Sequence, residues 1–250
     1  MRVDVFFLPQ EMTPADSANR VVAVVDVLRA STSIAMALAN GARAVIPLGS
    51  SEEVVARAKN LARSEVRLAG ERKMQPIPGY DMGNSPLEFS KDAVEGKTIL
   101  MSTTNGTAAI LAVQGARDVV VASYVNFSAV LTMLRAALRG GTDVTILCAG
   151  QDRRFALEDA ACAGLLVQHI TTKHTKAELN DAAHAAMLID KKFGSNLKRL
   201  FRTSAHGTAL ADAGFGDDLT ACADLDSFPV LPVYQDRQIT KLGPPPERAR

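Results

Sequence analysis

The 250-residue chain is 47% hydrophobic and 22% charged, so it can bury a full core as one large α/β domain. Its 28 basic and 27 acidic residues give a net charge of +1 without a long basic run, which excludes the charge pattern of a nucleic-acid-binding protein. The three cysteines have no C-x-x-C spacing, which argues against a zinc cage and a secreted disulfide framework. Because no apolar run approaches roughly 18 residues and no leader is recognisable, we expect a cytoplasmic protein that acts on a small charged ligand and contacts no membrane.

Strand-like and helical segments alternate along most of the chain. Continuous Val-rich runs predict strands that are buried on both faces, and the segments between them have helical patterns. This order is typical of an α/β fold with a largely parallel sheet. In chain order, we predict strands at 3–7, 21–27, 44–46, 66–69, 99–101, 119–121, 144–148 and 230–239, and helices at 33–39, 51–62, 126–139, 155–170, 182–193, 196–202 and 204–214.

Two parts of the chain, at about 20–65 and 95–139, repeat one pattern of strand, turn and helix. In each, a run of β-branched residues ends in hydroxyl residues that open a helix, and a Gly-Ala-Arg turn precedes the next strand. The repeat predicts an internal duplication within a single domain that covers residues 1–240. The Pro-rich segment 241–250 predicts a disordered tail.

Polar residues gather after four of the predicted strands. In open α/β sheets the ligand binds beyond the carboxyl ends of the strands, so these residues are the first candidates for a site. Helix capping explains each cluster alone, but four clusters together favour a binding site for an anion. The residues are Asp26, Arg29, Ser31 and Thr32; then Glu71 and Arg72; then Thr103, Thr104, Asn105 and Thr107; and finally Asp152, Arg153 and Arg154.

Asp26 stands out because a carboxylate in an otherwise apolar strand is costly to bury without a cation or several hydrogen-bond donors. It is therefore a candidate metal ligand or catalytic carboxylate. The alternative is that Asp26 lies at the end of the strand and caps the following turn. Arg29 could pair with Asp26 or hold an anion through two hydrogen bonds.

The segment 79–86 combines glycines with Asp81, Asn84 and Ser85, as a binding loop would. The alternative is a plain surface turn before a helix that begins at Pro86, which the order Asn-Ser-Pro also predicts. Both interpretations can hold together, because the start of a helix is itself an anion site.

Glu158 and Asp159 lie early in the predicted helix 155–170, where acids also favour the helix dipole. The functional interpretation makes one of them a magnesium ligand or a general base, because Mg²⁺ needs only one or two carboxylates besides waters and substrate oxygens. His206, in Ser-Ala-His-Gly, is a candidate catalytic residue, although a lone histidine is more often structural.

The chain lacks the Gly-rich phosphate loop of NTPases, the dinucleotide fingerprint G-x-G-x-x-G and the esterase elbow G-x-S-x-G. Cys148 and Arg154 do have the Cys-x5-Arg spacing of thiolate phosphatases, in which cysteine attacks phosphorus. No histidine precedes Cys148, however, and the loop glycine stands one position early. This route is kept as an alternative.

Six blocks occur in order: Val25–Ser33, Ala69–Arg72, Gly79–Pro86, Thr103–Thr107, Cys148–Gly150 and Leu157–Asp159. Together they resemble the 2-phosphosulfolactate phosphatase family, also called ComB. The resemblance implies a three-layer α/β/α fold built from two similar halves. It also implies a Mg²⁺-dependent phosphatase that hydrolyses 2-phospho-3-sulfolactate to 3-sulfolactate and phosphate, a step in coenzyme M biosynthesis.

On that resemblance we expect metal-assisted hydrolysis. The physiological substrate could be a related phosphorylated 2-hydroxy acid, and the apolar helices could support a homodimer. The alternatives are a non-catalytic module that binds small anions and a cysteine-dependent phosphatase. The expected roles are metal binding by Asp26, Glu71, Asp81 and Glu158; catalysis by Asp26, Asp159 and His206; and substrate binding by Arg29, Ser31, Thr32, Arg72, Asn84, Ser85, Thr103, Thr104, Asn105, Gly106 and Thr107.

Overall fold

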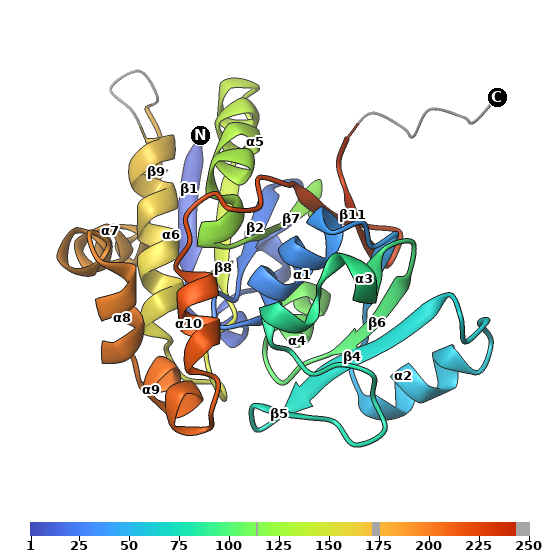
Figure 1. The fold of residues 1–250 in the computed structure, drawn as a ribbon. Helices are drawn as coiled ribbons and strands as arrows, with labels where there is room; N and C mark the ends of the chain where they lie inside the picture. The colour runs from blue at the N-terminus through green and yellow to red at the C-terminus, as the bar shows by residue number, and fades with distance from the viewer. Residues whose placement is uncertain (114, 172–175, 244–250) are drawn as a thin grey trace.

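The computed structural model describes residues 1–113, 115–171 and 176–243 and folds them around one eleven-stranded sheet (Figure 1). The strands are β1 (Arg2–Phe6), β2 (Val21–Val25), β3 (Ala44–Pro47), β4 (Val66–Arg72), β5 (Gln75–Pro76), β6 (Thr98–Ser102), β7 (Asp118–Ala122), β8 (Val144–Cys148), β9 (Glu178–Leu179), β10 (Pro232–Gln235) and β11 (Gln238–Lys241). Across the sheet their order is β5-β4-β6-β3-β11-β10-β7-β2-β8-β1-β9.

The sheet consists of two parallel sets of strands. One set is β4, β6 and β3, and the other is β7, β2, β8, β1 and β9. Between the sets, β11 and β10 pair antiparallel with each other and with their outer neighbours β3 and β7. Three antiparallel pairings in a row mean that the two sets run in opposite directions.

The hairpin of β10 and β11 replaces the single strand that the sequence predicts at 230–239. Asp236 and Arg237 form its turn with φ angles of 51° and 63°. Two positive φ angles in a two-residue turn match the twist of the flanking strands and reverse the chain. The C-terminal segment therefore joins the two parallel sets in the middle of the sheet.

Helices cover both faces of the sheet, which confirms the predicted α/β class with a largely parallel sheet. The side chains of β2 alternate between two cores: Val21, Ala23 and Val25 face one, and Val22 and Val24 face the other. The helices are α1 (Ala30–Ala39), α2 (Ser51–Ala58), α3 (Lys91–Val94), α4 (Gly106–Ala112), α5 (Phe127–Arg139), α6 (Leu157–Ile170), α7 (Asp181–Phe193), α8 (Leu197–Thr203), α9 (Ala205–Asp212) and α10 (Gly216–Cys222). Short 3-10 turns occupy Pro9–Glu11, Pro14–Asp16, Pro86–Glu88 and Tyr124–Asn126.

The two faces carry different helices. Ile34 of α1 and Ile110 of α4 pack in one core, whereas Leu134 of α5 and Leu166 of α6 pack in the other. Figure 1 shows α6, α7 and α8 gathered beside β1 at one end of the sheet, with α9 and α10 below and in front. These C-terminal helices bring residues after 200 close to the ends of the central strands.

Most element bounds agree with the sequence prediction, with differences at the ends. The helix predicted at 33–39 begins earlier, at Ala30, and the helix predicted at 51–62 ends at Ala58. The sequence did not predict α10. Its first turn contains Asp217 and Asp218, and such acids stabilise the start of a helix.

The two similar units interleave across the sheet. The strands β2 and β3 flank α1, and β6 and β7 flank α4, yet β2 pairs with β7 and β3 pairs with β6. An internal duplication stays a prediction.

Lys241, the first residue of the predicted tail, ends β11, and residues 244–250 of that tail lie outside the described residues. In the described part of the chain, no helix is both long and apolar enough to cross a membrane.

Candidate functional site

A cleft of about 470 Å³ lies where strands of both parallel sets end. Loops after β2 and β8 contribute from one set, and the end of β4 and the loop after β6 contribute from the other. The structure thus brings together residues from all four strand ends that the sequence singles out. Of the residues considered in the sequence, Asp26, Arg29, Glu71, Asn84, Thr103, Thr104, Asn105, Asp152 and His206 line this cleft.

Asp26 lies one residue beyond β2 and is 6% exposed. Its Oδ1 accepts a hydrogen bond from the Ala30 N–H at 3.1 Å, at the start of α1. Burial raises the pKa of Asp26 from its ordinary value of 3.8 to about 6, although the charge of nearby His206 opposes this shift. A Cβ atom at Gly106 would lie 2.5 Å from Asp26 Oδ2, so only glycine allows this close approach of α4. Asp26 therefore presents a poorly solvated carboxylate to the cleft.

Glu71, near the end of β4, is the second carboxylate of the cleft and is 7% exposed. Its Oε1 accepts the Thr104 N–H at 2.7 Å, and its Oε2 accepts the Met74 N–H at 2.9 Å. A carboxylate has about four lone-pair sites, so each oxygen can still accept another partner. Glu71 thereby holds the loop after β6 and the turn after β4 in place.

His206 in α9 reaches the cleft from the C-terminal helices. Its Nδ1 lies 3.1 Å from Oε1 of Glu158, a residue of the first turn of α6 that is 1% exposed. The other oxygen of Glu158, Oε2, is buried and has no hydrogen-bond partner within residues 1–113, 115–171 and 176–243. Among the described residues, His206 Nε2 makes no hydrogen bond. A buried carboxylate thus fixes the ring of a histidine whose other nitrogen is available to a ligand.

Asp159 follows Glu158 but does not line the cleft. Its Oδ1 accepts the Val27 N–H at 2.9 Å, and its Oδ2 accepts the Gly150 N–H at 3.1 Å. Burial raises the pKa of Asp159 well above its usual range, and the nearby Asp26 and Glu158 act in the same direction. Asp159 therefore ties the loops after β2 and β8 together. Because it does not line the cleft, it is not placed to act there as a base.

Arg29 lines the cleft, but its charge is already paired. Its Nη1 donates to Asp218 Oδ2 at 2.7 Å, and both side chains are almost fully buried. Its Nη2 donates to the Met74 carbonyl at 2.9 Å, and its guanidinium lies 4.3 Å from the centre of the Phe215 ring. Arg29 therefore joins α10 to the turn after β4, which differs from the expected role of an anion ligand.

Most of the expected hydroxyl ligands make internal hydrogen bonds instead. Thr32 Oγ1 donates to the Val27 carbonyl at 2.9 Å, and Ser31 Oγ accepts the Asp26 N–H at 2.9 Å. Thr103 and Thr107 bond to each other, each Oγ1 accepting the partner's N–H at 3.1 Å. Ser85 Oγ donates to Asp218 Oδ1 at 2.5 Å. These contacts shape the loops around the cleft.

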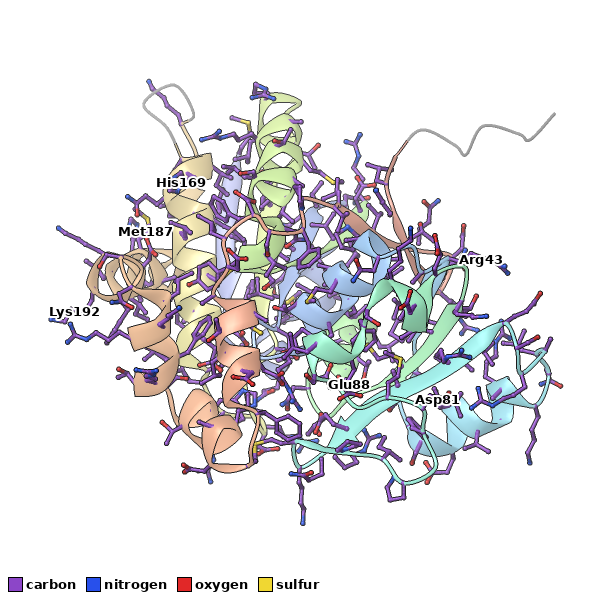
Figure 2. All side chains as sticks on the ribbon, in the orientation of Figure 1. Arg43, Asp81, Glu88, His169, Met187 and Lys192 are labelled. Carbon is purple, nitrogen blue, oxygen red and sulfur yellow. The ribbon has the colours of Figure 1, made fainter. Side chains whose placement is uncertain are left out.

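Arg72 and Asp81 are further predicted site residues that do not line the cleft. The Nη2 of Arg72 donates to Ser102 Oγ at 2.9 Å, at the end of β6. Asp81 forms an ion pair with Arg63 and accepts the Leu68 N–H at 2.8 Å, and Figure 2 shows it beside β4. Asp81 thus contributes to the packing of β4 and is not among the residues that line the cleft.

The cysteine-dependent route is not supported by the structure. Cys148 is 1% exposed and packs in a hydrophobic core, and burial raises the pKa of its thiol well above the usual range. A buried thiol in apolar surroundings is unreactive, because the thiolate is the nucleophile. Arg154 is exposed, and its N–H and carbonyl close the turn with Gln151. The spacing of Cys148 and Arg154 is therefore not a catalytic loop.

The cleft offers oxygen atoms of the kind that Mg²⁺ prefers as ligands. Within the described residues, no three His, Cys, Asp or Glu side chains form a group that could hold a metal alone. Magnesium needs only one or two carboxylates, because it keeps several waters and binds substrate oxygens. Asp26 and Glu71 supply two carboxylates, and the buried Oδ1 of Asn84 has no hydrogen-bond donor in the part of the chain that the structure describes.

Four residues that the sequence did not single out also line the cleft: Leu28, Lys73, Met74 and Gln151. Lys73 and Met74 form the two-residue turn between β4 and β5. Turns of this type usually contain Asn or Gly, and neither occurs here, so the sequence carries no turn signal at this place.

Comparisons with known proteins agree over almost the whole chain. A family model, 2-phosphosulpholactate phosphatase, matches residues 6–237. A protein of Symbiobacterium thermophilum described as a probable 2-phosphosulfolactate phosphatase is 41% identical over 230 residues, which cover 92% of this chain and 97% of that protein. Proteins with the same description from Clostridium beijerinckii and Carboxydothermus hydrogenoformans are 36% and 40% identical over 179 residues. Those matches cover 72% of this chain and 74% and 71% of the two relatives.

Proposed function

The chain belongs to the 2-phosphosulpholactate phosphatase family, and on that premise we propose that it hydrolyses 2-phospho-3-sulfolactate, or a related phosphorylated 2-hydroxy acid, with Mg²⁺. Membership confirms the resemblance found in the sequence and makes the protein a phosphoric monoester hydrolase. The observation that carries the proposal is that one cleft contains both the buried carboxylate of Asp26 and His206, whose ring Glu158 holds in place.

Asp26 and Glu71, with Oδ1 of Asn84, are the proposed ligands of Mg²⁺. Two buried carboxylates would repel a phosphate ester in the cleft, and a cation between them and the substrate would offset this repulsion. Bound Mg²⁺ would neutralise charge on the phosphoryl oxygens and help to orient them.

Backbone N–H groups are the proposed contacts of the phosphoryl oxygens, in place of the expected hydroxyl groups. In the turn after β6, the N–H groups of Asn105 and Gly106 have no acceptor among the described residues. Thr103 and Thr107 fix this turn by their mutual hydrogen bonds. The turn can therefore offer preorganised donors to charge that develops on the phosphoryl group.

His206 is the proposed proton donor to the leaving group. As water attacks phosphorus and the bond to the ester oxygen breaks, a proton from Nε2 would pass to that oxygen and release 3-sulfolactate. The carboxylate of Glu158, 3.1 Å from Nδ1, orients the ring. Asp159 is a positioning residue in this proposal, because its oxygens hold the loops that carry Asp26 and Gly150.

The wider role follows from the family resemblance alone. We propose that the reaction takes place in the cytoplasm and supplies 3-sulfolactate for coenzyme M biosynthesis. A homodimer stays a prediction that gel filtration with light scattering would test.

The direct test is phosphate release from 2-phospho-3-sulfolactate and from phosphorylated 2-hydroxy acids, measured with Mg²⁺ and with EDTA. The proposal predicts release that requires Mg²⁺ and is fastest with the preferred ester. Binding of these esters without any release, by folded protein with Mg²⁺ present, would instead identify a non-catalytic module that binds anions. Release that persists in EDTA would contradict the role of the metal.

A further inference from the structure

The turn between β4 and β5 places a lysine at the cleft in an unusual backbone conformation. Lys73 and Met74 have φ angles of 51° and 69°, a region that side chains other than Asn, Asp and Gly seldom adopt. Asn or Gly in this turn would avoid the steric cost. A costly backbone conformation at a residue that lines the cleft suggests that the side chain of Lys73 has a functional role there.

The turn is held from two sides. Glu71 Oε2 accepts the Met74 N–H, and Arg29 Nη2 donates to the Met74 carbonyl, each at 2.9 Å. Arg29 is itself fixed by its ion pair with Asp218. Lys73 is thus carried by a turn whose backbone is tied to the floor of the cleft, close to the proposed metal ligands.

Two other basic side chains at the cleft already have carboxylate partners, whereas Lys73 has none among the described residues. The charge of Arg29 is compensated by Asp218, and His206 is engaged by Glu158. In the described residues, the Lys73 ammonium has no hydrogen bond or ion pair. Lys73 is therefore free to meet an anion that enters the cleft.

We propose that Lys73 binds a second anionic group of the substrate, its sulfonate or its carboxylate, while the phosphate lies at Asp26 and the turn after β6. Lys73 thereby sets the preference for phosphate esters that carry such a group. This inference rests on the proposed function, because it assumes that a phosphate ester occupies the cleft.

Four esters separate the two anions: 2-phospho-3-sulfolactate, 2-phospholactate without the sulfonate, 2-sulfoethyl phosphate without the carboxylate, and ethyl phosphate without either. The variant Lys73→Asn removes the ammonium but suits the backbone of the turn, so its thermal midpoint should equal or exceed that of the wild type. We expect the ratio of kcat/KM for 2-phospho-3-sulfolactate to that for ethyl phosphate to fall about tenfold, as for one charge-assisted hydrogen bond. The intermediate ester that shows the same fall contains the anion that Lys73 binds.

Two further variants serve as controls. Lys73→Arg keeps the charge and should retain most of the preference, whereas Lys59→Asn removes an exposed lysine at the end of α2 and should leave the ratio unchanged. An unchanged ratio in Lys73→Asn, or an equal loss on all four esters, would overturn the inference while the proposed function stands. If the wild type acts on none of the esters, the proposed function fails. Calorimetric titration with 3-sulfolactate then tests whether Lys73 binds an anion in the cleft. Weaker binding by Lys73→Asn would support this role, and equal affinity of the wild type and Lys73→Asn would refute it.

Discussion

Asp26→Asn should make the metal-free protein more stable. Burial raises the pKa of Asp26 from 3.8 to about 6, so the folded protein disfavours the charged carboxylate at neutral pH. The difference of about two units corresponds to about 3 kcal/mol at 1.36 kcal/mol per unit, which is an upper estimate of the stability gained. For a chain of this length, that gain would raise the thermal midpoint by roughly 6–12 °C.

The gain should depend on pH in a defined direction. Because the pKa of Asp26 is higher in the folded protein than in the unfolded chain, the folded state binds the proton more tightly between pH 3.8 and about 6. Below pH 3.8 the carboxyl group is neutral in both states, and Asp26→Asn should have little effect there. The stabilisation should grow as the pH rises through this window and stay constant above pH 6.

Thermal unfolding in EDTA and in Mg²⁺ is the assay. The wild type should gain stability from Mg²⁺, since a metal that binds only the folded state stabilises it, and Asp26→Asn should gain little. Asp190→Asn is the matched control, because Asp190 is also 6% exposed and burial raises its pKa, but it lies in α7 away from the cleft. It should keep the response to Mg²⁺. A metal-free Asp26→Asn protein that is less stable than the wild type at pH 7 would refute the reasoning.

Three other substitutions test separate parts of the site. Glu158→Gln should lower kcat about 10- to 100-fold with little change in KM, because it removes the charge that supports His206 as a proton donor, and an unchanged kcat would contradict that role. Cys148→Ala should keep kcat/KM within about twofold, since the thiol is buried and unreactive, and a large loss in a folded variant would restore the cysteine route. Gly106→Ala should lower kcat/KM by about 100-fold or more, because its Cβ would lie 2.5 Å from Asp26 Oδ2, and normal activity would show that α4 can move away.

The sequence predicts the fold class well because the signals for it are local. The apolar run 21–27 and the polar residues after it correctly indicate a buried strand whose end faces the cleft. The central hairpin of β10 and β11 has no such signal, since its partners β3 and β7 lie far away along the chain. The hairpin also makes the two parallel sets run in opposite directions, so a local sequence pattern cannot predict those directions either.

The roles within the site depend on pairings that cannot be read from the sequence. Arg29 is compensated by Asp218, which is 189 positions away, and Glu158 meets His206 across 48 positions. Asp159 stands next to Glu158 in the sequence, but its oxygens hold backbone N–H groups of two loops and it does not line the cleft. Residue types alone suggested ligands for an anion, but the hydrogen bonds decide which polar groups remain free.

The most direct test of the account is the turnover of 2-phospho-3-sulfolactate by the wild type and by Asp26→Asn, with Mg²⁺ in excess and folding of both proteins verified. If Asp26 holds the metal in the cleft, the variant should lose several kcal/mol of transition-state stabilisation, which is a loss of about 1,000-fold or more in kcat/KM. Asp190→Asn, measured beside it, should retain activity. Activity of Asp26→Asn near that of the wild type would show that the reaction takes place elsewhere or without this carboxylate.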